Sequence, residues 1–144
     1  PPEPELRYAA LAGKGENLLV LGRKDKNELP DALAVFDQLA AIAEVPPMWR
    51  NQALYKKANT LELLGRHAEA LTALYDVLDE EHSSPREYFW FYKAGFDLAA
   101  RFEQQSDWKS AIGIYEKMAR VAGPRAADAT ARAKHLRLKH FIWE

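Results

Sequence analysis

Residues 51–79, NQALYKKANTLELLGRHAEALTALYDVLD, and residues 92–121, YKAGFDLAARFEQQSDWKSAIGIYEKMARV, share one spacing of small and large residues. In each stretch a small residue lies twelve positions before a second small residue: Ala58 and Ala70, then Ala99 and Ala111. Two helices cross closely only where their side chains are small, so each pair of alanines marks the crossing point of two helices. The sequence therefore predicts two helical hairpins of the same design.

The apolar positions after these alanines also repeat. Four positions after the second alanine stands a large apolar residue, and three positions later another: Leu74 and Val77, then Tyr115 and Met118. A weaker, earlier copy has Ala32, Phe36 and Leu39 at the matching positions, with its first helix in residues 6–21. Because no segment shows the alternation of a strand bounded by turns, we expect essentially no sheet.

This pattern resembles the tetratricopeptide repeat (TPR) family. The residues that carry the resemblance are Leu54, Ala58, Leu61, Gly65, Ala70, Leu74 and Val77, and then Gly95, Ala99, Phe102, Ser106, Asp107, Ala111, Tyr115 and Met118. The sequence departs from the family at Ala58 and Ala99, where glycine is usual, and at Gly95, where a large residue is usual. The resemblance implies an all-α fold, a right-handed α-α superhelix (solenoid) of about three hairpins plus a C-terminal capping helix.

We expect a single TPR-like domain over residues 1–144, with hairpins at about 5–45, 47–81 and 85–122 and a terminal helix at 124–143. Ser84-Pro85-Arg86-Glu87 has the residue types of a capping box, which predicts that the fifth helix begins at Pro85. Gly65 is predicted to end the third helix in the left-handed conformation, and Ser106-Asp107 to cap the sixth. Pro124 is expected to begin the seventh. Since residue 1 is proline, the chain is expected to be a fragment resembling the C-terminal repeats of a larger TPR protein.

The composition is that of a folded chain without a strong global charge. Apolar residues make up 48% of the 144 residues and the net charge is −1, so no long-range field attracts nucleic acid or membrane. The sequence has no apolar run of roughly 18 residues, and residues 1–15 lack the features of a signal peptide. Zero cysteines exclude disulfides, thiolate zinc sites and a thiol nucleophile, and leave the compartment open between cytoplasm and periplasm.

The resemblance also implies a binding surface, because in TPR proteins the first helix of each hairpin lines a concave groove that holds peptides. By position, the groove residues are Gln52, Tyr55, Asn59 and Glu62 in one hairpin and Lys93, Phe96, Ala100 and Glu103 in the next. An ordinary solvated polar face is the competing interpretation. The family variant that grips a terminal carboxylate is not indicated, since Lys56 and Asp97 stand where asparagine and arginine are needed.

The run Tyr88-Phe89-Trp90-Phe91-Tyr92 is the most unusual local feature. Successive helical residues turn by about 100°, so five in a row cannot all face one core. One interpretation is a helix sandwiched between neighbours and buried on most sides. The other is an aromatic interface for a peptide or a second subunit, with Trp90, Tyr92, Phe141 and Trp143 as its candidate residues.

The C-terminal helix is basic, with Arg125, Arg132, Lys134, Arg137 and Lys139 against Asp128 and Glu144. It offers weak nucleic-acid contact as an alternative, although a solvated helix face explains the same charges. The histidines show no paired metal spacing, and Gly13-Lys14-Gly15 lacks the spacing of a phosphate-binding loop. We therefore expect no catalytic, cofactor or metal site, and no enzyme.

The sequence thus favours a non-catalytic scaffold module that binds a protein or peptide segment, of unknown identity, in its groove. Structural self-association, as a homo-oligomer, or docking onto another part of the same protein through exposed aromatic residues is the alternative. Nucleic-acid contact through the basic helix is the third.

Overall fold

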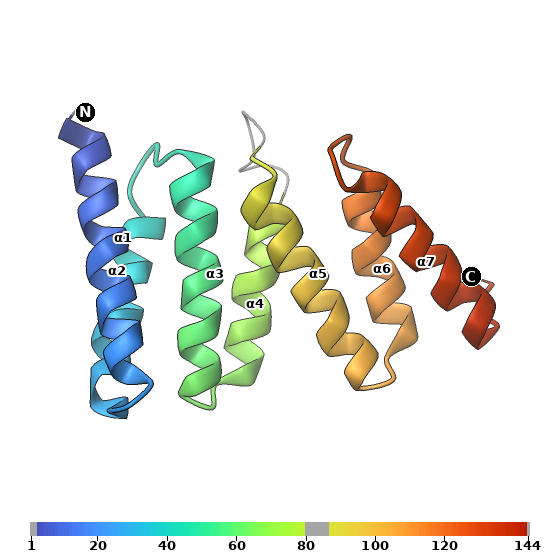
Figure 1. Ribbon diagram of the computed structural model, residues 1–144, viewed down its shortest axis with the longest axis horizontal. Helices are drawn as coiled ribbons and strands as arrows, with labels where there is room; N and C mark the ends of the chain where they lie inside the picture. The colour runs from blue at the N-terminus through green and yellow to red at the C-terminus, as the bar shows by residue number, and fades with distance from the viewer. Residues whose placement is uncertain (1–2, 80–86, 144) are drawn as a thin grey trace. The chain divides into compact units, whose positions relative to one another are not determined.

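The computed structural model describes residues 3–79 and 87–143 (Figure 1). These residues form helices with short connections and contain no strand, which confirms the predicted all-α class. The sequence predicted one domain over residues 1–144, and the structure divides this length into two compact units, residues 1–87 and residues 88–144. In chain order the elements are α1 (Glu3–Gly22), the 3-10 turn η1 (Lys26–Glu28), α2 (Leu29–Ala40), α3 (Pro47–Leu63), α4 (His67–Val77), α5 (Phe89–Gln104), α6 (Trp108–Ala119) and α7 (Ala126–His140).

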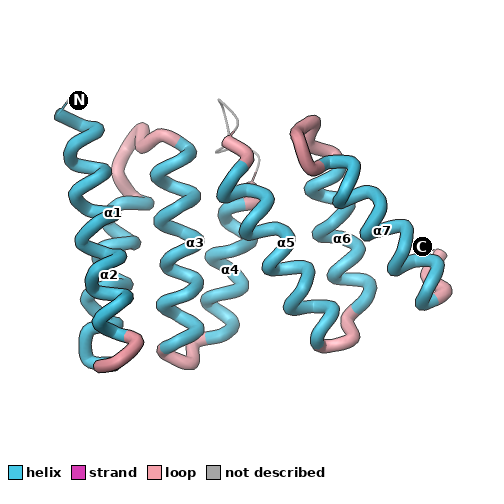
Figure 2. The backbone as a smooth tube through the Cα atoms, in the orientation of Figure 1, coloured by secondary structure: helices cyan, strands magenta, loops and turns pink. Residues whose placement is uncertain are grey.

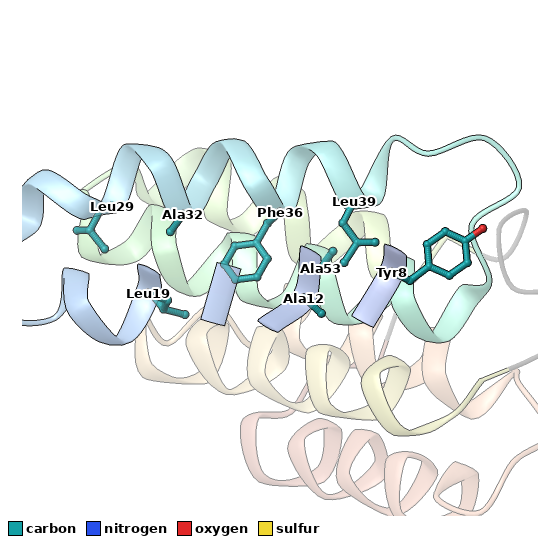
Figure 3. Close-up of a cluster of buried hydrophobic side chains, with 8 residues drawn as sticks. All are labelled: Tyr8, Ala12, Leu19, Leu29, Ala32, Phe36, Leu39 and Ala53. Atoms are coloured by element: carbon teal, nitrogen blue, oxygen red, sulfur yellow. The ribbon is translucent and has the colours of Figure 1, made fainter. Parts of the chain in front are cut away.

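The first unit consists of α1 to α4, and each helix packs on the next one in the chain, as Figure 2 shows with the connecting loops. Helix α1 also contacts α3. In the close-up of Figure 3, Phe36 of α2 points toward α1. It belongs to a cluster of buried side chains drawn from three helices: Tyr8, Ala12, Leu19, Leu29, Ala32, Phe36, Leu39 and Ala53.

The earliest hairpin does not keep the spacing of the other two. Ala32, Phe36 and Leu39 are buried as the weak repeat predicted, but the residue twelve positions before Ala32 is Val20, which is 53% exposed. Leu19 is buried instead. The turn η1 lengthens the connection between α1 and α2, and it therefore shifts which face of α1 meets α2.

Hairpin α3–α4 closes through a three-residue connection after Leu63. Ala58 and Ala70 are fully buried, as expected at a close crossing. Gly65 has φ +76°, and the Arg66 N–H donates to the Leu61 carbonyl at 2.9 Å. This is the hydrogen bond of a Schellman helix end, so the predicted left-handed role of Gly65 is confirmed.

In the second unit α5 packs on α6, and α6 packs on α7. Ala99 and Ala111 are fully buried. Gly95, one turn before Ala99, lies so close to Met118 that a Cβ atom at this position would overlap the methionine side chain. The size of Met118 thus explains why glycine, and not a large residue, stands at position 95.

Hairpin α5–α6 closes in the same way as α3–α4. Ser106 has φ +59°, and the Asp107 N–H donates to the Phe102 carbonyl at 2.9 Å. The Asp107 carboxylate then accepts a hydrogen bond from the Ser110 N–H at 3.2 Å, which caps α6. The predicted cap at Ser106-Asp107 is confirmed.

Two predicted helix starts are wrong. Helix α5 begins at Phe89 rather than at Pro85, so Glu87 lies before the helix and does not complete a capping box; its carboxylate accepts from Asn51 Nδ2 at 3.0 Å instead. Residues 84–86 of that motif lie outside the described residues. Helix α7 begins at Ala126 rather than at Pro124, because residues 120–125 form the connection from α6.

Candidate functional site

A cleft of about 590 Å³ lies in the second unit, where the start of α5 meets the connection between α6 and α7. Three aromatic side chains, one proline and two cationic side chains line it: Tyr88, Phe89, Tyr92, Lys93, Pro124 and Arg125. Its size falls in the range of ligand-binding clefts, which is about 300–1,000 Å³. No carboxylate is among the lining residues, so the lining carries two positive charges and no negative one.

The aromatic run supplies one side of the cleft because of its helical spacing. Tyr88 and Tyr92 are four residues apart, as are Phe89 and Lys93, so these four residues share one face at the start of α5. Phe91 points into the core and is fully buried. The run is therefore partly core and partly surface: Phe91 and Tyr92 are buried, as a sandwiched helix predicts, while Phe89 is 66% exposed and available as contact surface.

The two tyrosines form the wall nearest the α6–α7 connection. Their rings stack with centroids 5.9 Å apart, and the Tyr88 hydroxyl donates to the Ala122 carbonyl at 2.8 Å. Gly123 fits against this wall because a Cβ atom there would overlap both the Tyr92 hydroxyl and the Tyr88 ring. The Tyr92 side chain is 3% exposed, and its hydroxyl has no hydrogen-bond partner among the described residues.

The two cations lie against aromatic rings at the edge of the cleft. Lys93 Nζ is 5.9 Å from the centroid of the Phe89 ring. The guanidinium of Arg125 lies 3.9 Å from the centroid of Phe96 and also 3.3 Å from Asp128. Both side chains are exposed to solvent, so an anionic group can approach them.

A hydrogen-bonded network fixes α7, and with it Arg125, relative to α5. The Tyr115 hydroxyl donates to Glu103 at 2.5 Å, and Arg132 donates to both oxygens of the same carboxylate at 3.0 and 3.1 Å. Burial, together with the hydrogen bond to Glu103, raises the pKa of Tyr115 above its ordinary value. The raised pKa extends to higher pH the range over which the phenol stays protonated and donates to Glu103.

The structure brings together only part of the predicted groove. Lys93 lines the cleft, and Phe96 lies under Arg125 beside it. Glu103 is held in the network with Tyr115 and Arg132. In the first unit the predicted groove residues are half-buried along α3: Gln52, Tyr55, Asn59 and Glu62. The Glu62 carboxylate lies 2.9 Å from His67 Nδ1.

The residues of the predicted aromatic interface lie in different surroundings. Tyr92 is buried in the cleft wall, and Trp90 is half-buried with its ring edge-to-face against Phe89. Phe141 and Trp143, at the end of α7, are 78% and 70% exposed. Phe141 also has φ +55°, a conformation that bulky residues rarely adopt.

Much of the charge on the basic helix is paired within the protein. Arg125 lies 3.3 Å from Asp128, Arg132 lies 3.0 Å from Glu103, and Arg137 lies 2.8 Å from Glu116. His140 stacks on Trp108 of α6 with centroids 3.8 Å apart. The contacts of Arg132, Arg137 and His140 attach α7 to α5 and α6, which gives these residues a structural role.

Of the residues that line the cleft, the sequence singled out Tyr92 and Lys93 as candidate binding residues. It did not single out Tyr88, Phe89, Pro124 and Arg125 as lining residues of one cleft. Tyr88 and Phe89 were visible only as members of the aromatic run. Pro124 and Arg125 come from a connection whose position depends on tertiary packing, so no local signal marks them.

The described residues hold no cluster of side chains suited to a metal ion. Within residues 3–79 and 87–143, no helix is both long and apolar enough to cross a bilayer. What this arrangement offers chemically is aromatic contact surface and two cations.

Comparison with protein-family models, with curated proteins and with solved structures gave no match for this chain.

Proposed function

We propose that the chain is a non-catalytic binding module and that the cleft of the second unit holds a segment of another protein. The observation that carries this proposal is the lining of the cleft, where exposed Phe89 and the tyrosine wall stand beside two cations. Aromatic and arginine side chains are the groups most often responsible for the binding energy of protein interfaces.

The mechanism is presentation of a preformed surface. The Tyr88–Ala122 hydrogen bond and the Glu103 network hold both sides of the cleft before any partner arrives. A surface that is already ordered loses less conformational entropy on binding, so more of the contact energy remains as affinity.

The finer architecture belongs to the same proposal. We infer a TPR-like right-handed superhelix from the repeated small-residue crossings, which are fully buried at Ala58, Ala70, Ala99 and Ala111. In such an array, neighbouring hairpins stabilise one another by stacking. The first helix of each hairpin then lines the binding side, which agrees with a cleft at the start of α5.

Self-association is the second candidate, and one observation favours it. Phe141 and Trp143 expose most of their surface at the end of α7, and Phe141 does so in a strained left-handed conformation. Sedimentation over a wide concentration range tests this candidate, since a strict monomer contradicts it.

Selection from a library of displayed random peptides tests the binding module. The proposal predicts a family of related peptides that bind the chain and lose binding when Phe89 is replaced by alanine. Tyr55→Ala on α3 is the matched control, because it removes an aromatic ring from the first unit. The proposal is contradicted if no peptide family is enriched, or if the enriched peptides bind the Phe89→Ala variant equally well.

A further inference from the structure

We propose that the cleft recognises an acidic peptide segment in which carboxylates flank an aromatic or large apolar side chain. This inference rests on the proposed function and goes beyond it by naming the chemistry of the bound segment. It follows from two separate features of the cleft, which are its charge and its aromatic surface.

The charge of the lining selects for anions. Lys93 and Arg125 line the cleft and no acidic residue does, so a bound carboxylate meets two cations among the lining residues. The Arg125 guanidinium is already oriented by Phe96 at 3.9 Å, and its contact with Asp128 joins two exposed side chains. An exposed pair of this kind is weak, so a partner carboxylate can compete for the guanidinium.

The aromatic surface selects for a ring or another large apolar group. Phe89 is 66% exposed beside the stacked pair of Tyr88 and Tyr92. A second aromatic ring can lie edge-to-face or offset against these rings, which adds to the contact made by its area alone. A uniformly acidic segment would leave this surface exposed to water.

Fluorescence anisotropy with three labelled peptides tests the inference. The first peptide carries a tryptophan between two pairs of glutamates; the second has glutamine in place of each glutamate; the third has alanine in place of the tryptophan. We expect the second and third peptides to bind at least about tenfold more weakly than the first, and affinity for the first to fall as salt is raised.

Matched variants locate the binding. Lys93→Gln and Arg125→Gln should each weaken the acidic peptide several-fold, while Lys109→Gln, an exposed lysine on α6, should leave the affinity unchanged.

Each outcome separates this inference from the proposed function. Equal binding of the glutamine peptide, or loss of affinity in Lys109→Gln as large as in Arg125→Gln, overturns the inference. If the display selection yields apolar or basic peptides that still require Phe89, the binding module stands and the acidic preference falls. If it yields no peptide family at all, both fall.

Discussion

The hairpins α3–α4 and α5–α6 correspond residue by residue at a shift of 41 positions, from Ala70 to Ala111, but they use different side chains at the same structural positions. The crossing alanines are buried in both, and both close with the same backbone hydrogen bond, from Arg66 to Leu61 and from Asp107 to Phe102. The comparison shows that a few positions fix the hairpin backbone. The remaining positions differ in size and polarity between the two hairpins.

The clearest difference is an exchange of size across the hairpin. At the positions that match Gly95 and Met118 of the second hairpin, the first hairpin has buried Leu54 and Val77, which are larger and smaller respectively. The lost volume at Gly95 is filled by Met118, which would overlap any Cβ atom there. Core positions therefore vary together, because the interior is close-packed.

The largest effect is expected from breaking this exchange. Gly95→Leu should lower the free energy of unfolding by about 3 kcal/mol, the upper end of the usual cost of overpacking, because Met118 leaves no space for the new side chain. Adding Met118→Val, which recreates the Leu54–Val77 pair, should restore part of the loss. Urea denaturation measures both, and a double variant less stable than Gly95→Leu alone would refute the exchange.

Overpacking the crossings tests what the two hairpins share. Ala70→Leu and Ala111→Leu should each cost about 1–3 kcal/mol, since both alanines are fully buried. Thermal denaturation should show a lower melting temperature for each leucine variant. The control Gly113→Ala, at an exposed position on α6 with open space around it, should not lower the melting temperature. Unchanged melting of both leucine variants would remove the equivalence of the hairpins.

The helix ends offer a smaller test with opposite signs. Gly65→Ser should lower the free energy of unfolding by about 1 kcal/mol, because serine is strained at φ +76°. Ser106→Gly should raise it by up to about 1 kcal/mol, because glycine relieves the same strain at φ +59°. The paired urea midpoints give the comparison directly. Shifts of the same sign in the two variants would show that the two turns are not equivalent.

The smallest expected effect concerns the caps of α4 and α6. The Asp107 side chain caps α6, while Arg66 at the matching position makes no side-chain cap. Asp107→Ala should therefore lower the free energy of unfolding by about 1 kcal/mol. Arg66→Ser should raise it by about 0.5 kcal/mol, because the new cap outweighs the loss of the exposed ion pair with Glu69. The same midpoints measure these changes, and a stable Asp107→Ala variant would argue against the capping bond.

The sequence predicted the helices well where a local signal marks their ends. Gly65 and Asp107 are signals of this kind, because their conformation or hydrogen bond involves residues only a few positions away. The predicted start of α5 was wrong because a capping-box pattern is also compatible with a loop. Glu87 lies in the connection before α5 and accepts a hydrogen bond from Asn51 of α3. Val20 was exposed because the turn η1 altered the register, which the repeat spacing does not encode.

The candidate site was predictable only in part. Tyr92 and Lys93 were recognised because an aromatic run and a repeat position single them out. Arg125 reaches the cleft through contacts with Phe96 and through the network that anchors α7. Such contacts join residues distant in sequence, so neither periodicity nor composition indicates them.

The central claim is that binding takes place in the cleft of the second unit. The most direct test is to follow the backbone amide signals of isotope-labelled protein by NMR while the tryptophan–glutamate peptide is added. We predict that the signals of Phe89, Lys93 and Arg125 shift to saturation, while those of Tyr55 and Asn59 on α3 stay in place. Shifts confined to α3, or no saturating shifts at the start of α5, would contradict the account.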